Sequence, residues 1–366
     1  MVILVNPSIL ESSFIPDRLV ARDGEIERIM ETVIKPTKNG ITTNLILYGD
    51  SGTGKTVTMR YLAREIRDPQ VVYVNAIAYR YVKNVLIDFL SKFGIIVPER
   101  SSYASLFTRI EGLLRNQGKN VILVIDEAAN ILKGDYDGLY YLFRSKDSFD
   151  VNISTIFVVM EDPAILFDAK IRKSYGIFSE IKFRRYTKGE IYQIVMNRAV
   201  QSLTGEGYDE DVLDYIAEVS AEYGSARVGI DILAKAAHIA EYRRSPKISF
   251  DDVRAARSMI SPFVTESKLA SMDYEDLMVL LSICRCLSAS RFTDVDCISR
   301  NLSVISEQYG KKDINLYDRI KRLENNGIIS SSIEGQGRGE GVKKVISIYD
   351  IPVSVLTEKI ENLLSA

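Results

Sequence analysis

The segment "GDSGTGKT", from Gly49 to Thr56, most constrains what this chain can fold into. It satisfies G-x-x-x-x-G-K-[ST], follows the apolar run "NLILY" and opens the amphipathic stretch "KTVTMRYLAREI". In this context, glycines let backbone N–H groups surround a phosphate at the positive end of a helix. Chance matches usually lack that context, so the segment predicts a nucleotide-binding P-loop rather than a ligand-free turn. The residues expected to contact ATP or ADP are Gly49, Asp50, Ser51, Gly52, Thr53, Gly54, Lys55, Thr56 and Val57.

A second part of the site is predicted by "VILVIDE", an apolar run that ends in Asp126 and Glu127. Adjacent carboxylates at a strand end place one side chain toward Mg²⁺ and the next toward a water that attacks the γ-phosphate. We therefore expect Thr56 and Asp126 to bind Mg²⁺ and Glu127 to position the water, which makes the chain an ATPase. An acidic pair can also be a mere strand end, but the upstream P-loop favours the catalytic interpretation.

Two arginines are candidates for sensing the γ-phosphate. Arg227, in "YGSARVGID", opens a predicted helix, where the dipole disfavours a cation unless an anion compensates for it. Arg172, in "DAKIRKSYG", follows the last predicted strand, where a solvated loop cation is an equally good interpretation.

The rest of the chain divides into three parts by its pattern. Up to about residue 185, short apolar runs alternate with amphipathic ones, which predicts an α/β domain with a parallel sheet covered by helices. The next part reads as helices alone, a helical lid, and Pro262 marks a joint. Three helices and two strands then outline a winged helix-turn-helix. The predicted domains are residues 1–185, 186–262 and 263–366.

Composition limits the surroundings in which the protein works. No apolar run approaches the roughly 18 residues of a membrane span, and the N-terminus lacks the basic flank of a signal peptide. We therefore expect a cytoplasmic protein associated with the nucleoid.

The cysteines and the net charge limit the kinds of site. The spacing of Cys284, Cys286 and Cys297 is not that of a metal site, so we expect reduced thiols in the core. With 47 basic and 49 acidic residues, any nucleic-acid surface must be local.

Such a local surface is predicted at the C-terminal end. Eight basic and five acidic residues lie between Lys311 and Lys344, a local excess of three positive charges in a chain of net charge −2. In the helix "INLYDRIKRLENNG", Ile320 and Leu323 face the core, so the polar residues face outward toward a major groove. The glycine-rich tip after this helix is expected to grip the DNA backbone or the minor groove. Protein docking is the alternative use of such a domain. The expected DNA contacts are Asn315, Arg319, Arg322, Arg338, Lys343 and Lys344.

These motifs together resemble the archaeal Orc1/Cdc6 replication initiators of the AAA+ class. The shared segments are "RDGEIERI", "NLILYGDSGTGKT", "VILVIDEAANIL", "YGSARVGIDIL" and "NNGIISSSIEGQGRGEGVKK", in the order of that family and over nearly the whole chain. The resemblance implies that Lys55 and Thr56 are Walker A ligands and that Asp126 and Glu127 are Walker B residues.

The resemblance also implies roles outside the phosphate loop. Arg227 would be sensor 2 and Arg172 an arginine finger, while Arg80 and Lys83 would lie in an inserted segment that touches DNA or be only an exposed helix face. One position departs from the family: "VVMEDP" places Glu161 or a neighbour where a sensor-1 asparagine is usual. An acidic group there would repel the γ-phosphate unless Mg²⁺ or an arginine intervenes, so we expect slow, switch-like hydrolysis or a bound nucleotide that serves mainly as a structural clamp.

The sequence thus predicts an ATP-dependent protein that binds duplex DNA at replication origins. From the resemblance alone, it would help to load the replicative helicase and could share its site with a paralogous initiator. An ATP-gated winged-helix signalling or transcription regulator is the alternative, and a ring-forming remodelling ATPase is a third possibility.

Overall fold

The structure is a computed structural model of the chain. It describes residues 2–117, 120–166, 178–260, 269, 272–288, 290–311, 313–326, 328–335, 342–348 and 352–365. The chain forms two compact units, which are treated separately below. The first comprises Met1–Ser12, Ile191–Glu222 and Arg227–Ala366, and the second comprises Ser13–Glu190 and Tyr223–Ala226.

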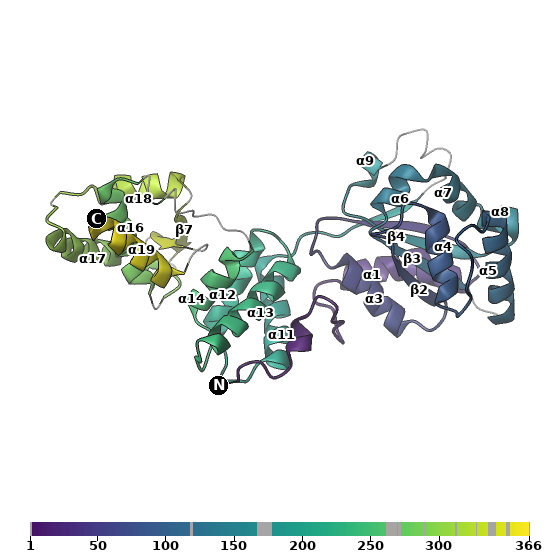
Figure 1. Cartoon of the computed structure of the whole chain (residues 1–366), viewed down its shortest axis with the longest axis horizontal. Coiled ribbons are helices and arrows are strands. Elements are labelled where there is room, and N and C mark those ends of the chain that lie inside the picture. The colour runs from purple at the N-terminus through teal and green to yellow at the C-terminus, as the bar shows by residue number, and fades with distance from the viewer. Residues whose placement is uncertain are drawn as a thin grey trace. The chain divides into compact units, whose positions relative to one another are not determined.

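The second unit is built on a five-stranded parallel sheet (Figure 1). Its strands are β1 (Asn44–Tyr48), β2 (Gln70–Asn75), β3 (Val121–Asp126), β4 (Ile153–Val158) and β5 (Ser179–Lys182), in the order β2-β3-β4-β1-β5. β1 therefore lies between β4 and β5, with Leu45 opposite both Ile156 and Ser179. β3 and β4 are buried along their whole lengths, in agreement with the apolar run from Val121 to Ile125 in β3 and the largely apolar sequence of β4. The predicted α/β class is confirmed.

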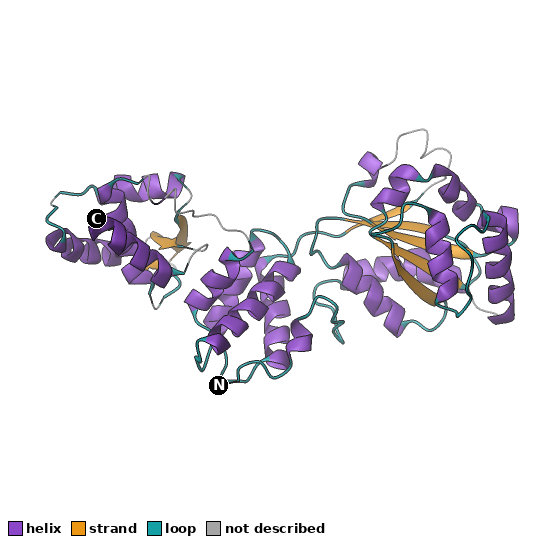
Figure 2. Ribbon diagram, viewed as in Figure 1, coloured by secondary structure: helices purple, strands orange, loops and turns teal. Residues whose placement is uncertain are grey.

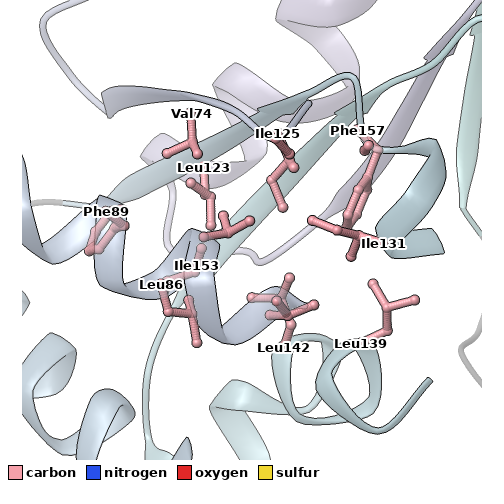
Figure 3. Packing of buried hydrophobic residues seen from close by; sticks show 14 of the residues in the cluster. Val74, Leu86, Phe89, Leu123, Ile125, Ile131, Leu139, Leu142, Ile153 and Phe157 are labelled. Carbon is pink, nitrogen blue, oxygen red and sulfur yellow. The ribbon is translucent and has the colours of Figure 1, made fainter. Parts of the chain in front are cut away.

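Helices cover both faces of this sheet (Figure 2). Ile46 of β1 joins a core beneath α4, α5, α6 and α7, whereas its neighbours Leu45 and Leu47 join a second core beneath α1 and α3. Figure 3 shows the first core, in which Leu86 and Phe89 of α4 pack toward Leu123 and Ile125 of β3. The helices are α1 (Asp23–Ile29), α2 (Lys35–Lys38), α3 (Lys55–Glu65), α4 (Val82–Ser91), α5 (Tyr103–Gln117), α6 (Ala129–Gly134), α7 (Tyr136–Phe143), α8 (Ser145–Phe149) and α9 (Pro163–Leu166). A π-helical turn, η2 (Met30–Ile34), joins α1 to α2.

The first unit contains the predicted helical lid. Its helices are α11 (Lys188–Ser202), α12 (Glu210–Ala221), α13 (Ala226–Tyr242) and α14 (Phe250–Ser258), and the first residues of α11 and α13 belong to the second unit. The start of α14 is fixed by a capping box between Ser249 and Asp252, as the sequence "SFDD" favours. The chain's beginning, with its 3-10 turn η1 (Pro7–Leu10), is held here because the amides of Ile3 and Leu4 donate to Glu241 at 2.8 Å.

The same unit contains the winged helix-turn-helix. It consists of α16 (Tyr274–Leu287), β6 (Thr293–Asp294), α17 (Val295–Gln308), α18 (Leu316–Asn325), β7 (Ser330–Gly335), β8 (Val342–Ser347) and α19 (Val353–Ser365). The strands form an antiparallel sheet in the order β6-β8-β7. The three helices and the hairpin match the sequence prediction, whereas β6 and α19 were not predicted.

The expectation of reduced cysteines is wrong for two of the three. Cys286 of α16 and Cys297 of α17 form a disulfide, while Cys284 is a buried free thiol. The two bonded cysteines lie where α16 and α17 pack together, with their Cα atoms 6.3 Å apart, within the normal reach of a disulfide. Burial raises the pKa of the Cys284 thiol to about 12, which keeps it protonated.

A buried arginine joins the lid to the winged helix within the first unit. Arg254 of α14 is fully buried and donates to the backbone oxygens of Ile348 at 3.0 Å and Ser290 at 3.1 Å. Asp251, one turn earlier, pairs with Arg254. It also accepts hydrogen bonds from the amides of Val353 at 3.0 Å and Ser354 at 3.2 Å, so a lid carboxylate caps α19.

A helix with the length and apolar character of a membrane span does not occur in the described part of the chain.

Candidate nucleotide site and nucleic-acid interface

The phosphate loop leaves the end of β1 with three glycines at positive φ. These angles are 141° at Gly49, 77° at Gly52 and 92° at Gly54, a region that side chains rarely allow. The loop is also closely packed, because a Cβ atom would lie 2.4 Å from the Phe183 oxygen at Gly49 and 2.5 Å from the Tyr186 hydroxyl at Gly54. The conformation therefore favours glycine at all three positions, and close packing against the backbone of Phe183 adds to this at Gly49.

Lys55 opens α3 directly after this loop. Its ammonium group lies 2.6 Å from the Gly49 oxygen and 2.8 Å from the Asp50 oxygen, and the residue is 7% exposed. A cation inside a loop at a helix N-terminus is the arrangement that binds the phosphates of a nucleotide. The residues from Gly49 to Val57 therefore have the geometry expected of a P-loop.

Arg22 is a part of the site whose role sequence reasoning missed. It is fully buried, and its guanidinium donates twice to the Thr53 oxygen, at 2.9 and 2.8 Å, and to the Arg184 oxygen at 2.8 Å. It also lies 3.8 Å from the ring centre of Tyr186 and pairs with Glu25 at 3.2 Å. One side chain thus fixes the P-loop backbone to the residues after β5. The only signal was its place in the quoted "RDGEIERI" motif.

A short link of the second unit connects the P-loop to the start of α13. The Ala226 amide donates to the Gly52 oxygen at 3.1 Å. Gly224, at φ 58°, leaves room for the Arg185 side chain, whose Nε donates to Asp50 of the P-loop at 2.6 Å. This hydrogen bond lowers the pKa of the Asp50 carboxyl, so the pair is charged at neutral pH. The next residue along the chain is Arg227, which is exposed and lies in the first turn of α13, as predicted.

The predicted acidic pair ends β3. Asp126 is 2% exposed, and its carboxylate accepts the Tyr73 hydroxyl at 2.5 Å and the Glu127 amide at 3.0 Å. Burial and this hydrogen bond raise the pKa of Tyr73, which stays a neutral donor. Glu127 is exposed and adopts a φ of 55°, where residues other than glycine are uncommon and strain often marks a functional site.

The donor set fits a magnesium ion that arrives with a nucleotide. Mg²⁺ usually takes one or two protein oxygens and completes its shell with waters and phosphates. Thr56 and Asp126 supply a hydroxyl and a carboxylate of this kind. Across the described residues, no group of three or more His, Cys, Asp or Glu side chains could hold a metal by itself.

Glu161, at the unusual sensor position, has a cationic partner. Lys133 of α6 donates to it at 2.7 Å, and this hydrogen bond lowers the pKa of the Glu161 carboxyl. If Glu161 lies near a γ-phosphate, as expected from the sequence, the charge of Lys133 would reduce the repulsion between them. Arg172, the predicted finger, lies outside the described residues.

The predicted DNA contacts of α18 have unequal surroundings. Asn315 is exposed and caps the helix by accepting the Asp318 amide, and the Arg322 side chain is 51% exposed. The Arg319 side chain is only 22% exposed, because α16 covers it with three carboxylates. Arg319 is therefore partly covered rather than freely exposed, and its contact with DNA stays a prediction. The helical spacing did not reveal carboxylate partners 43 to 46 residues away.

The remaining predicted contacts are only partly described. Lys344 is exposed and pairs with Glu324 at 3.0 Å, Lys343 is described in its backbone alone, and Arg338 lies outside the described residues. In the second unit, Arg80 is exposed and Lys83 is partly buried in the first turn of α4.

Comparison with known proteins shows which families and structures these features are similar to. The model of the "Cdc6 AAA+ ATPase-type lid domain" matches residues 192–258, and an "AAA domain" model matches residues 42–163. The ORC1-type DNA replication protein of Desulfurococcus amylolyticus is 23% identical, over 98% of this chain and 94% of that protein. ORC1-type DNA replication protein 1 of Methanothermobacter thermautotrophicus is 26% identical, over 93% and 91%.

Solved structures of Cdc6 and ORC1 proteins are also similar to this chain. The Cdc6p structure from Pyrobaculum aerophilum has a TM-score of 0.82 and 25% identity, and the alignment covers 99% of both chains. The Aeropyrum pernix ORC1 protein, solved in complex with DNA, has a TM-score of 0.61 and 25% identity, over 99% of this chain and 97% of that one.

The fold and the phosphate loop define an AAA+ protein with the domains of an ATPase. The match to a Cdc6-type lid and the relatives aligned over nearly their whole lengths make the chain similar, further, to the Orc1/Cdc6-type replication proteins.

The first prediction concerns Arg22. Arg22→Ala leaves the Thr53 and Arg184 oxygens and Glu25 without their donor, so it should lower the free energy of unfolding by about 3 kcal/mol or more. The P-loop loses its support, so ATP affinity should fall about tenfold or more, or about 1.4 kcal/mol. Urea unfolding and equilibrium binding of a fluorescent ATP analogue measure the two effects. The control is Arg28→Ala, at an exposed position of α1. If both variants behave like the wild type, Arg22 does not support the loop.

The second prediction concerns Glu127. If Glu127 is the base that positions water, Glu127→Gln should keep the shape and the bound ATP but lose that base, so single-turnover hydrolysis should fall roughly 10²-fold. Rapid-quench measurement with enzyme in excess over ATP reports this rate, and the exposed Glu99→Gln is the control. Hydrolysis at the wild-type rate in Glu127→Gln would contradict the assignment.

Proposed function

We propose that this chain is an ATP-dependent origin-recognition protein that binds duplex DNA at replication origins through its winged helix. The observation that carries the proposal is the presence, in one chain, of a P-loop site and a winged helix-turn-helix in which the segment from Lys311 to Lys344 has eight basic and five acidic residues. The similarity to the Aeropyrum pernix ORC1 protein, which was solved in complex with DNA, supports the same use of this chain.

The nucleotide site would hold ATP or ADP on the backbone of Gly49–Val57, with Lys55 on the terminal phosphates. Thr56 and Asp126 would hold Mg²⁺, which neutralises phosphate charge, and Glu127 would orient the attacking water. Arg227 and Arg172 are proposed to sense the γ-phosphate. Because Glu161 replaces the usual asparagine and needs Lys133 to balance its charge, we propose slow hydrolysis that serves as a switch.

The nucleotide state would influence the winged helix through the lid. The P-loop and the start of α13 share the hydrogen bond between Gly52 and Ala226. Within the first unit, Arg254 and Asp251 of α14 bind the winged-helix backbone at the end of α16 and between β8 and α19. A change at the γ-phosphate that moves the lid would therefore move the winged helix with it.

On the DNA, α18 would enter the major groove, and the wing residues Arg338, Lys343 and Lys344 would contact the backbone. Arg80 and Lys83 would make a further contact, flanked by the exposed side chains of Ile77 and Tyr81. We also propose, from the family resemblance, that the protein helps to load the replicative helicase and shares origins with a paralogous initiator.

Titrations at several salt concentrations test DNA binding, with duplexes taken from the origins of the source genome and scrambled duplexes of equal length. Changing Arg338, Lys343 and Lys344 together to Ala should weaken binding to both duplexes and reduce the log–log salt slope by up to roughly three, one for each lost phosphate contact.

The matched control changes three exposed cations of the second unit to Ala: Arg67, Lys92 and Arg109. It should bind as the wild type does. If the wing variant keeps the wild-type affinity and slope, the wing does not contact DNA and protein docking becomes the better account. A preference for promoters over origins would favour the transcription regulator instead.

A further inference from the structure

The first turn of α16 carries three carboxylates that face α18. This acidic turn consists of Asp273, Glu275 and Asp276. Arg319 of α18 reaches all three, with N–O distances of 2.5, 2.6 and 3.1 Å. Arg322 pairs with Asp273 at 2.6 Å and with Asp276 at 3.3 Å. Two arginines of the proposed recognition helix are therefore already bound to carboxylates of their own domain.

The burial of these ion pairs makes it unfavourable for Arg319 to leave its carboxylate partners and bind DNA instead. The Asp276 side chain is 1% exposed, so moving Arg319 away would leave this buried carboxylate with only its longer contact to Arg322, at 3.3 Å, which is unfavourable. Burial works against the charge of Arg319, but its hydrogen bonds to Asp273 and Asp276 outweigh this and raise its pKa. A bidentate contact with one guanine would replace three charge-assisted hydrogen bonds with two.

The charges on this flank of α18 also balance. Lys311 pairs with Glu275 at 3.3 Å, so three cations meet the three carboxylates of the acidic turn. A neutral cluster offers no net attraction to phosphates. This flank is therefore poorly suited to approach a DNA backbone.

The other flank of α18 differs in both exposure and charge. Tyr317, Lys321 and Asn325 are exposed and follow one another at intervals of four residues, so they lie on one face of the helix. The Tyr317 residue is 72% exposed. Of the three cations on α18, Lys321 alone has no ion pair within the described part of the chain.

We propose that α18 reads DNA through this face of Tyr317, Lys321 and Asn325, and that Arg319 is a positioning residue that anchors the helix to the acidic turn. The chemistry of the face fits base edges: lysine donates to guanine O6 and N7, asparagine pairs with adenine N6 and N7, and tyrosine reaches the sugar-phosphate backbone. The inference rests on the proposed function, and it reverses the role expected of Arg319 from the sequence.

The test compares four variants on origin and scrambled duplexes. Lys321→Ala should lose about 5- to 150-fold in affinity for origin DNA, the effect of one base contact, with little change on scrambled DNA and an unchanged urea midpoint. Asn325→Ala should also reduce the preference for origin DNA. Arg319→Ala should lower the urea midpoint and weaken binding to both duplexes.

The decisive variant is the double change Arg319→Met with Asp276→Asn, which removes the arginine and the buried charge together. Replacing both partners of a buried pair can be nearly neutral for stability, so the urea midpoint and the origin preference should both recover. A residue that only reads bases could not be rescued in this way.

Two results would overturn the proposal. One is an Arg319→Ala variant with the wild-type urea midpoint that has lost its preference for origin DNA. The other is a Lys321→Ala variant with wild-type origin affinity. If the wild type binds no duplex at all, the proposed function fails and the reading face fails with it, whereas the urea midpoints still decide whether Arg319 anchors α18.

Discussion

The guanidinium group of Arg22 is the contact on which the nucleotide site depends. It lies fully buried between α1, the P-loop and the residues after β5, where it binds the oxygens of Thr53 and Arg184 and stacks on Tyr186. A buried cation is stable only when its donors are satisfied, and here backbone oxygens and Glu25 satisfy them. Its loss would therefore disturb the P-loop backbone and the end of β5 together.

Two further arginines hold elements together in the same way. Arg254 joins the lid helix α14 to the backbone around α16 and β8, and Arg319 joins α18 to the first turn of α16. Each satisfies oxygens that lie far away in the sequence. In the first unit, the contacts of Arg254 connect the lid to the winged helix. Under the proposed function, nucleotide state would act on both through the Tyr223–Ala226 link, whose Ala226 amide binds the P-loop.

Much of the fold and the nucleotide site could be predicted from the sequence, because their signals are local. The P-loop, the acidic pair after β3 and the parallel strands each depend on a short stretch of residues. The buried arginines could not be predicted, because a charged residue in a helical pattern reads as exposed until its distant partners are known. The Cys286–Cys297 disulfide was missed for a related reason, since it needs the packing of α16 on α17.

Under the proposed function, the binding of nucleotide and the binding of DNA are coupled through the lid. The most direct measurement is the affinity of the full chain for a non-hydrolysable ATP analogue with Mg²⁺, in the presence and absence of saturating origin duplex, together with the converse titration. Coupling of about 1 kcal/mol or more predicts that each ligand changes the affinity of the other by the same factor, about fivefold or more. Equal affinities with and without the second ligand, in both titrations, would contradict the account.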